Sequence, residues 1–220
     1  MVTVRGSQES VEARLRSGRL ACACGGTLRR WGHARSRQVA TFSGPMQVRP
    51  RRAICRDGCG RTHVLLPGWL LSRRRYAAVV IFAALALRAA GLKVAGVAGR
   101  LRLPVPGRPG RWWSVPASTA ASWLSRFASR AGVLRQVFLA VLPLADAQAR
   151  PVLGAGSLSA DALAVLEAVT AGLRRRFAGL ATVAAHEVAA HLTGGMLLAP
   201  AMPAVAGNTS LFAVAAAGSS

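Results

Sequence analysis

All four cysteines of this chain lie in two short pairs near its N-terminus. The first pair reads Cys22-Ala23-Cys24-Gly25-Gly26, and the second reads Cys55-Arg56-Asp57-Gly58-Cys59-Gly60. Paired ligands on glycine-containing turns suit a structural zinc ion, which binds four thiolate or imidazole groups in a tetrahedron. Because a β-prone arm separates the two pairs, they predict a small zinc-ribbon-like head in which the chain folds back on itself.

The expected ligands are Cys22, Cys24, Cys55 and Cys59, around a zinc ion with a structural role. Their spacings are Cys-x-Cys and Cys-x3-Cys, and each differs by one residue from the usual Cys-x2-Cys, in opposite directions. Two alternatives stay open: His33 or His63 replaces one thiol, or the head folds without metal. No general base beside an open coordination position is evident, so the sequence does not predict catalysis by zinc.

The positive charge of the chain is concentrated in its first two-thirds. The formal net charge is +22, of which +13 falls in residues 1–75 and +9 in residues 76–150, whereas residues 151–220 are neutral. Codon bias can explain 28 Arg against one Lys, but it does not explain the scarcity of acids before residue 150. The distribution therefore predicts a polyanionic partner, most simply double-stranded DNA.

Changes in composition along the chain predict four segments and a mainly α fold. Residues 1–19 hold a short helix that Ser7 caps, residues 20–70 form the basic head, and residues 72–142 form a helical domain. Residues 143–220 supply further helices (159–177 and 180–192) and a flexible tail rich in Ala, Gly and Pro. The predicted class is thus a small β head followed by a helix-turn-helix, homeodomain-like helical domain.

The helical domain shows the order of a three-helix DNA-binding unit. Helices are expected to about residue 90, over 93–103, and from Pro116 through the positions around 130. The third would place its first residues in the major groove, with the Pro/Gly-rich loop 104–111 acting as a wing on phosphates. An ordinary helical bundle with a tryptophan core is the alternative. The predicted DNA-binding residues are Arg29, Arg30, Arg35, Arg37, Arg73, Arg74, Arg75, Arg108, Arg111, Ser118, Thr119, Ser122 and Arg126.

Several other functions are disfavoured. His186 and His191 are five residues apart, about 140° around a helix, so they do not converge as the histidines of a zinc protease do. Seven acids, three of them in the neutral tail, make a catalytic carboxylate cluster improbable, and no phosphate-binding glycine loop occurs. The longest apolar run, residues 76–87, is too short to span a bilayer, and the first 19 residues do not resemble a signal peptide. We expect a non-enzymatic cytoplasmic protein, associated with the nucleoid.

The motifs taken together resemble an uncharacterised family of small proteins from high-GC bacteria. The resemblance rests on the cysteine pairs and on the strings Leu28-Arg29-Arg30-Trp31-Gly32, Thr62-His63-Val64-Leu65-Leu66-Pro67 and Trp123-Leu124-Ser125-Arg126-Phe127. Leu197-Leu198-Ala199-Pro200 and Asn208-Thr209-Ser210 extend it to the tail. That family, often labelled transposase-like, implies a zinc-ribbon-like head and a helix-turn-helix. It also implies Cys-x2-Cys knuckles and a short turn before Ser118, and this chain departs from both.

The sequence thus predicts a DNA-binding protein of transposase-like or regulatory type, without catalysis of its own. The head would contact phosphates, and the helix near 116–130 would lie in the major groove. Two alternatives remain: an RNA-binding zinc-ribbon protein that stacks bases on Trp31, and a degenerate, inactive copy of a mobile-element protein. A homodimer is one arrangement open to such a chain.

Overall fold

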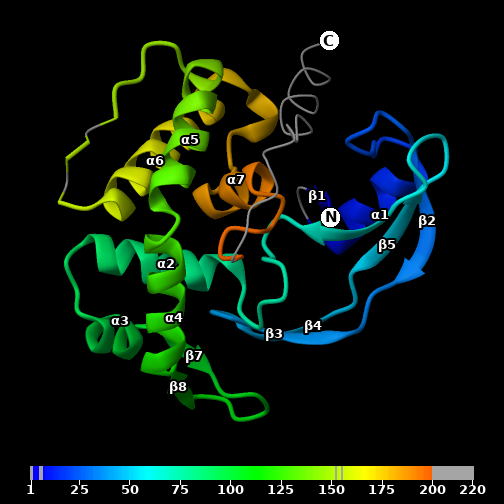
Figure 1. Cartoon of the computed structure of the whole chain (residues 1–220). Coiled ribbons are helices and arrows are strands. Elements are labelled where there is room, and N and C mark those ends of the chain that lie inside the picture. The colour runs from blue at the N-terminus through cyan, green and yellow to red at the C-terminus, as the bar shows by residue number, and fades with distance from the viewer. Residues whose placement is uncertain (1, 5–6, 152, 155, 200–220) are drawn as a thin grey trace.

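Strands contribute more to this protein than its helix-rich sequence predicts. The computed structural model describes residues 2–4, 7–151, 153–154 and 156–199. About 44% of the described residues are helical and 21% lie in strands or β-bridges, with a mixed sheet of four strands (Figure 1). The prediction of a mainly α fold was therefore wrong. The head, which the sequence predicts to be β, holds six of the eight strands among the described residues, and two further strands lie at 102–104 and 112–114, where none was predicted.

The head is built on a four-stranded sheet with the order β1-β6-β5-β2. The chain's first strand pairs parallel to the last strand of the head, with Val2 opposite Leu65, and the other neighbours are antiparallel. A bulge between Arg30 and Gly32 interrupts the ladder of the edge strand. The strands are β1 (Val2–Val4), β2 (Leu28–His33), β5 (Arg51–Cys55) and β6 (Thr62–Pro67).

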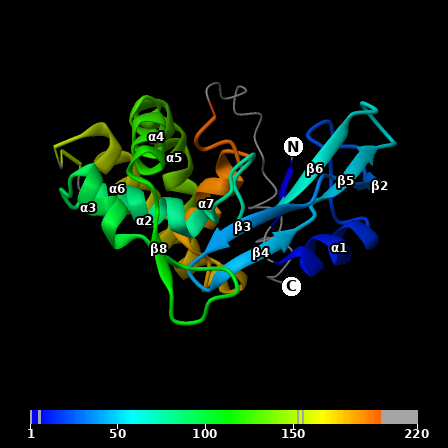
Figure 2. The same ribbon diagram turned by 90° about the horizontal axis from the view of Figure 1, so that it is seen from below.

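One face of this sheet is covered by helix α1 (Gln8–Arg16), as Figure 2 shows. The Ser7 side chain accepts a hydrogen bond from the Ser10 amide, which confirms the predicted N-cap. Val11 and Leu15 turn inward and join the buried residues of the sheet. These contacts give the head a core separate from that of the helices.

A second hairpin, inserted between two strands of the head sheet, extends from the head and packs against the helices. It consists of β3 (Arg37–Thr41) and β4 (Gly44–Val48), which pair antiparallel. Val39 and Val48 are buried in the helical core rather than in the head. The Ala40 amide donates to the Arg75 carbonyl at 2.8 Å, and the Ala40 carbonyl accepts from the Ala77 amide at 2.9 Å. The hairpin therefore fixes the basic segment before α2 in place.

The helical part contains two packed groups. Helices α2, α3 and α4 contact one another, and α5 runs against α6 with α7 beside it (Figure 1). Trp123 and Phe127 of α4 are buried, as their helical spacing predicts. The helices are α2 (Ala78–Ala89), α3 (Val94–Arg100), α4 (Ala117–Ala128), α5 (Ala131–Ala145), α6 (Leu158–Arg176) and α7 (Ala185–Leu192), with a 3-10 turn η1 (Ala178–Leu180).

The connection between α3 and α4 corrects the helix-turn-helix prediction. Residues 101–116 form a β-hairpin of β7 (Arg102–Pro104) and β8 (Trp112–Ser114) instead of a tight turn. A helix-turn-helix joins its two helices by about three to four residues. The unit is thus three mutually packed helices with a hairpin inserted before α4, and it does not have homeodomain-like connectivity.

The segment 194–199 packs between the head and the helices. The Ser72 amide, in the segment that follows β6, donates to the Gly195 carbonyl at 2.8 Å, and Leu197 and Leu198 are buried. Arg130 donates to the carbonyls of Met196 and Leu197 at 2.8 and 3.2 Å. The flexible tail predicted from residue 194 onward is therefore packed in its first six residues, whereas residues 200–220 lie outside the described residues.

No single helix in the described ranges has both the length and the apolarity to cross a membrane. Only α4 and α5 taken together reach that threshold, and they are bent by 59° at their junction.

The close approach of α5 to α6 depends on a glycine and is open to test. A Cβ added at Gly172 would lie 2.8 Å from the Cβ of Asp146 and 3.0 Å from the backbone of Ala145. We therefore expect Gly172→Ala to lower the free energy of unfolding by about 1–3 kcal/mol, measured by chemical denaturation. Gly132→Ala on α5 is the control, because nothing lies within 4 Å of its added Cβ. It should raise stability by up to about 1 kcal/mol. Equal effects of the two substitutions would contradict this packing.

Candidate metal centre and nucleic-acid surface

The four cysteines come together where two turns of the head face each other. The first turn is closed by the Cys22 amide donating to the Gly26 carbonyl at 2.7 Å. The second follows β5, and its base is closed by the Cys55 amide donating to the Arg61 carbonyl at 3.0 Å. Cys22 and Cys55 are buried, whereas Cys24 and Cys59 are exposed. The off-by-one spacings of the sequence thus still permit the two pairs to converge.

The sulfur positions fit a tetrahedral metal ion. All four Sγ atoms lie within 4.8 Å of one another. Two of the separations cross between the turns: Cys22 Sγ to Cys59 Sγ is 3.6 Å, and Cys24 Sγ to Cys55 Sγ is 3.5 Å. Four sulfurs bound at about 2.3 Å from one zinc ion would lie about 3.8 Å apart. The cluster could therefore hold a metal ion with only small movements of its side chains.

Two glycines let the backbone lie against these sulfurs. A Cβ at Gly26 would lie 2.6 Å from the Cys55 sulfur. A Cβ at Gly58 would lie 2.8 Å from the Cys24 sulfur and 3.1 Å from the Cys55 sulfur. Any other residue at either position would have to displace a thiol. The glycines of the two turns are therefore part of the site's geometry.

The two histidines considered as ligands lie in different places. His63 Nε2 is 3.3 Å from the Cys22 sulfur, so it can hydrogen-bond to that sulfur or stand beside it as an alternative ligand. His33 is the last residue of β2, at the end of the strand away from the cluster. It is five residues along the strand from Leu28, which pairs with Cys55. Five residues of strand span about 16 Å. The structure therefore excludes His33, but not His63, from the vicinity of the cluster.

The surroundings of the thiols affect their ionisation unequally. Amides of Gly26 and Cys59 donate to the Cys24 sulfur and lower its pKa to about 6. Burial raises the pKa of Cys55 to about 12 and also raises the pKa of Cys22. Metal ligation requires thiolates, so a bound cation would have to favour ionisation of the two buried sulfurs.

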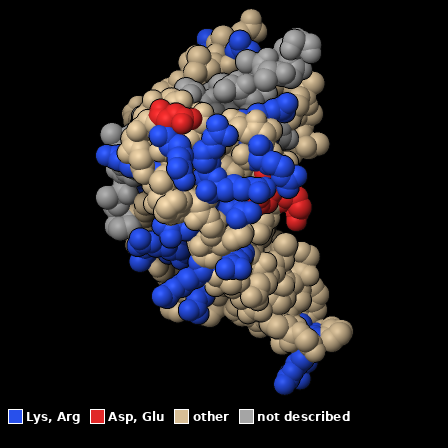
Figure 3. Space-filling view, turned by 90° about the vertical axis from the view of Figure 1, so that its right-hand side faces the viewer, with Lys and Arg blue, Asp and Glu red and all other residues tan. Residues whose placement is uncertain are grey.

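Most of the arginines predicted to contact DNA are exposed. No carboxylate pairs with seven of them within the described part of the chain, although ion pairs do engage Arg30, Arg51, Arg135 and Arg175. Figure 3 shows basic side chains across the middle of the head-side face and acidic ones only near its margin. The seven are Arg29, Arg35, Arg73, Arg75, Arg108, Arg111 and Arg126.

Three of the predicted arginines are instead engaged within the protein. Arg37 is partly buried and donates to the Leu71 carbonyl at 3.3 Å, and burial lowers its pKa. Arg74 donates to the Leu198 carbonyl at 2.7 Å, and burial, followed by the charge of Arg126, lowers its pKa. Arg30 is 3.6 Å from Glu12 but stays half exposed. The first two primarily hold chain segments together.

Helix α4 presents a row of small polar side chains between basic groups. Ser118, Ser122, Ser125 and Ser129 follow a helical spacing along one side and are exposed or half-buried, and Thr119 is half-buried near the start. The hairpin that bears Arg108 and Arg111 leads into the first turn of α4, and Arg126 lies in its last turn. The sequence prediction missed Ser125 and Ser129, although the same periodicity predicts them.

The sheet face opposite α1 is another feature that the sequence prediction named only in part. Cross-strand register places Arg29 beside Ile54, and Arg52 beside Val64, on this face. Trp31, at the bulge of the edge strand, is 50% exposed. Arg52 was not identified from the sequence, because only the strand register distinguishes it from Arg51, which faces α1 and Glu12.

The ion pairs of Glu12 make the stability of the head depend on pH. Arg51 donates to Glu12 at 2.9 Å, and this hydrogen bonding lowers the pKa of Glu12. A lowered folded-state pKa stabilises the protein above the unfolded value of 4.5, and this stabilisation is lost as the pH falls through the folded value. We expect Glu12→Gln to cost about 1 kcal/mol of unfolding free energy at pH 7 and progressively less below pH 4.5. Glu167→Gln, at an exposed position of α6, should show no such dependence in the same denaturation series.

Comparison with known proteins identifies no relative from which a function could be transferred. No family model, no curated protein and no solved structure matches the chain. The resemblance to a transposase-like zinc-ribbon family therefore stays a prediction from the motifs.

Proposed function

We propose that this protein binds double-stranded DNA without catalysing a reaction on it, in the manner of a transposase-like accessory protein or a regulator. The basic head contacts phosphates, and α4 lies in the major groove. The observation that carries the proposal is the set of seven exposed arginines without a carboxylate partner among the described residues. Many like charges on one surface repel one another, and binding of a polyanion relieves this repulsion.

The serine-lined side of α4 supports a close approach to the duplex. Small hydroxyl side chains let a helix enter a groove and can donate to phosphates, but they offer little bidentate readout of bases. A helix of 12 residues is about 18 Å long, which separates the hairpin arginines from Arg126. Affinity would therefore come mainly from phosphate contacts, with modest sequence preference.

A structural zinc ion in the four-cysteine cluster completes the proposal. Purified protein should contain about one zinc ion per chain, lost in Cys24→Ser and Cys59→Ser. Gly58→Ala should also lose it, although all four thiols remain, because its Cβ would lie 2.8 Å from the Cys24 sulfur. Gly99→Ala, with nothing within 4 Å of its Cβ, is the matched control and should retain the metal.

His63→Ala distinguishes the two possible ligand sets. Retention of zinc supports four thiolates, and loss of zinc supports a site in which His63 replaces one of them. Metal-free wild-type protein with a folded head would contradict a zinc site of either kind.

Phosphate contacts make the affinity for a duplex steeply dependent on salt. If the seven arginines each neutralise one phosphate, the slope of log K against log salt should be about −6. Arg108→Gln with Arg111→Gln should reduce its magnitude by about 2, as should Arg29→Gln with Arg35→Gln. Arg150→Gln with Arg176→Gln, two exposed arginines outside the proposed contact set, should leave it unchanged. A flat slope, or no binding at about 50 mM salt, would contradict DNA binding.

RNA binding is the second candidate, and one observation favours it. Trp31 is 50% exposed at the bulge of the edge strand, two residues from Arg29, and a base could stack on it. Tighter binding of single-stranded or structured RNA than of duplex DNA, lost on Trp31→Ala, would favour this candidate over the first.

A further inference from the structure

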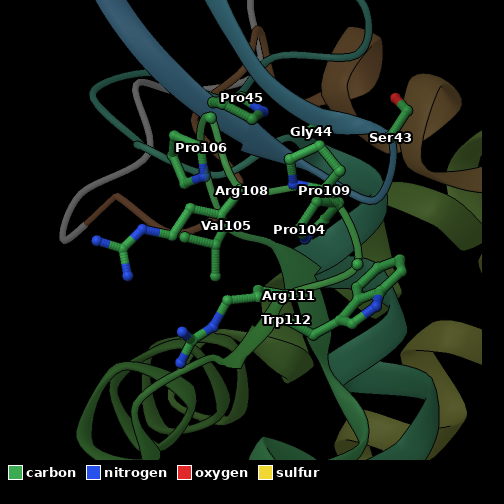
Figure 4. Close-up of a pocket in the computed structure, with 12 residues that line it drawn as sticks. Ser43, Gly44, Pro45, Pro104, Val105, Pro106, Arg108, Pro109, Arg111 and Trp112 are labelled. Carbon is green, nitrogen blue, oxygen red and sulfur yellow. The ribbon is translucent and has the colours of Figure 1, made fainter.

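A cleft lies between the tip of the β3–β4 hairpin and the loop of the β7–β8 hairpin (Figure 4). Its volume is about 290 Å³. Ser43, Gly44 and Pro45 form one wall, and residues 104–112 form the other. The predicted wing loop is thus one side of a concave site.

The loop wall of this cleft is conformationally restricted. The Val105 amide donates to the Arg111 carbonyl at 2.9 Å, and two further backbone hydrogen bonds join Arg108 to Val105 and Arg111 to Arg108, each at 3.2 Å. Three prolines at positions 104, 106 and 109 fix backbone torsions between these bonds. The two arginines are therefore presented on a preorganised loop, which reduces the entropy lost on binding a ligand.

An exposed aromatic ring lies on the cleft wall. Trp112 is 50% exposed, whereas its neighbour Trp113 packs toward Tyr76, with ring centroids 6.0 Å apart. In Figure 4 the side chains of Arg108 and Arg111 extend to the same side of the loop, and the indole of Trp112 lies on the other side of the proline-lined region. No carboxylate is among the residues that line the cleft.

These features match the chemistry of a nucleotide. A planar apolar ring can stack on Trp112, while an attached phosphate is attracted by the two arginines. Proteins that hold single strands combine an aromatic platform with a basic groove in this way, and stacking is worth about 1–3 kcal/mol per base. The cleft is near the lower limit of about 300 Å³ for ligand pockets, so it suits one nucleotide rather than a longer segment.

We propose that this cleft binds an unpaired nucleotide at the end of the duplex that the rest of the surface contacts. The inference rests on the proposed DNA binding for the position of the duplex, and it adds a preference for ends that carry a single-stranded extension. Charge complementarity supports this occupant, because the cleft and the exposed surface of its loop carry positive charge only.

The test compares a blunt duplex, the same duplex with a short single-stranded thymidine extension, and the extension alone. Fluorescence anisotropy at about 50 mM salt gives each affinity. In wild-type protein the extension should raise duplex affinity about tenfold. Trp112→Ala should abolish this gain and leave blunt-duplex affinity unchanged, whereas Trp112→Phe, which keeps a planar ring, should retain most of it. Trp31→Ala is the matched control, because Trp31 is equally exposed, and it should keep the full gain.

The outcomes separate this inference from the proposed function. If blunt duplex is bound but the extension adds nothing, or if Trp31→Ala rather than Trp112→Ala removes the gain, the cleft assignment is overturned while DNA binding stands. If wild-type protein does not bind blunt duplex, DNA binding as proposed fails. Binding of the extension alone then tests the cleft assignment separately. Binding that Trp112→Ala abolishes would support the assignment, and no binding of the extension would overturn it.

Discussion

Four cysteine sulfurs lie together where two turns of the head meet, and they could hold a metal ion that joins the turns. The core of the head holds nine buried residues, two of which are the cysteines Cys22 and Cys55. A core of that size rarely stabilises a fold without a metal or another cross-link. At Gly26 and Gly58 the backbone itself lies against the sulfurs. Neither position carries a side chain that could pack between the two turns in place of a bound ion. A metal ion bound there would therefore stabilise the same turns that position the basic strands.

Hydrogen bonds from backbone and side-chain groups hold the head in a fixed position relative to the helices. Strand β1 pairs with β6 in the head while Thr3 donates to α7, and the β3–β4 hairpin hydrogen-bonds to the segment that precedes α2. Arg37, Arg74 and Arg130 bind carbonyl groups where these parts meet. Some of the arginines thus stabilise the junction between the head and the helices. The exposed arginines lie on segments that these contacts hold in place.

Local patterns predicted the local features of the structure. The Ser7 cap, the helix that begins after Pro116 and the buried Trp123 and Phe127 depend on neighbours a few residues away, and the structure confirms them. The parallel pairing of β1, the reach of β3–β4 and the hairpin before α4 depend on distant partners, which a single sequence does not specify. For the same reason, the sequence grouped the four cysteines but did not reveal their cross-turn arrangement or the side of the sheet on which Arg52 lies.

The central claim is that the exposed arginines of the head, the hairpin loop and α4 contact DNA. Arginine modification by phenylglyoxal, read by mass spectrometry with and without duplex, tests it most directly. The account predicts protection of Arg29, Arg35, Arg108, Arg111 and Arg126 in the complex, with unchanged modification of Arg150 and Arg176. Equal modification of all exposed arginines, or protection confined to Arg150 and Arg176, would contradict it.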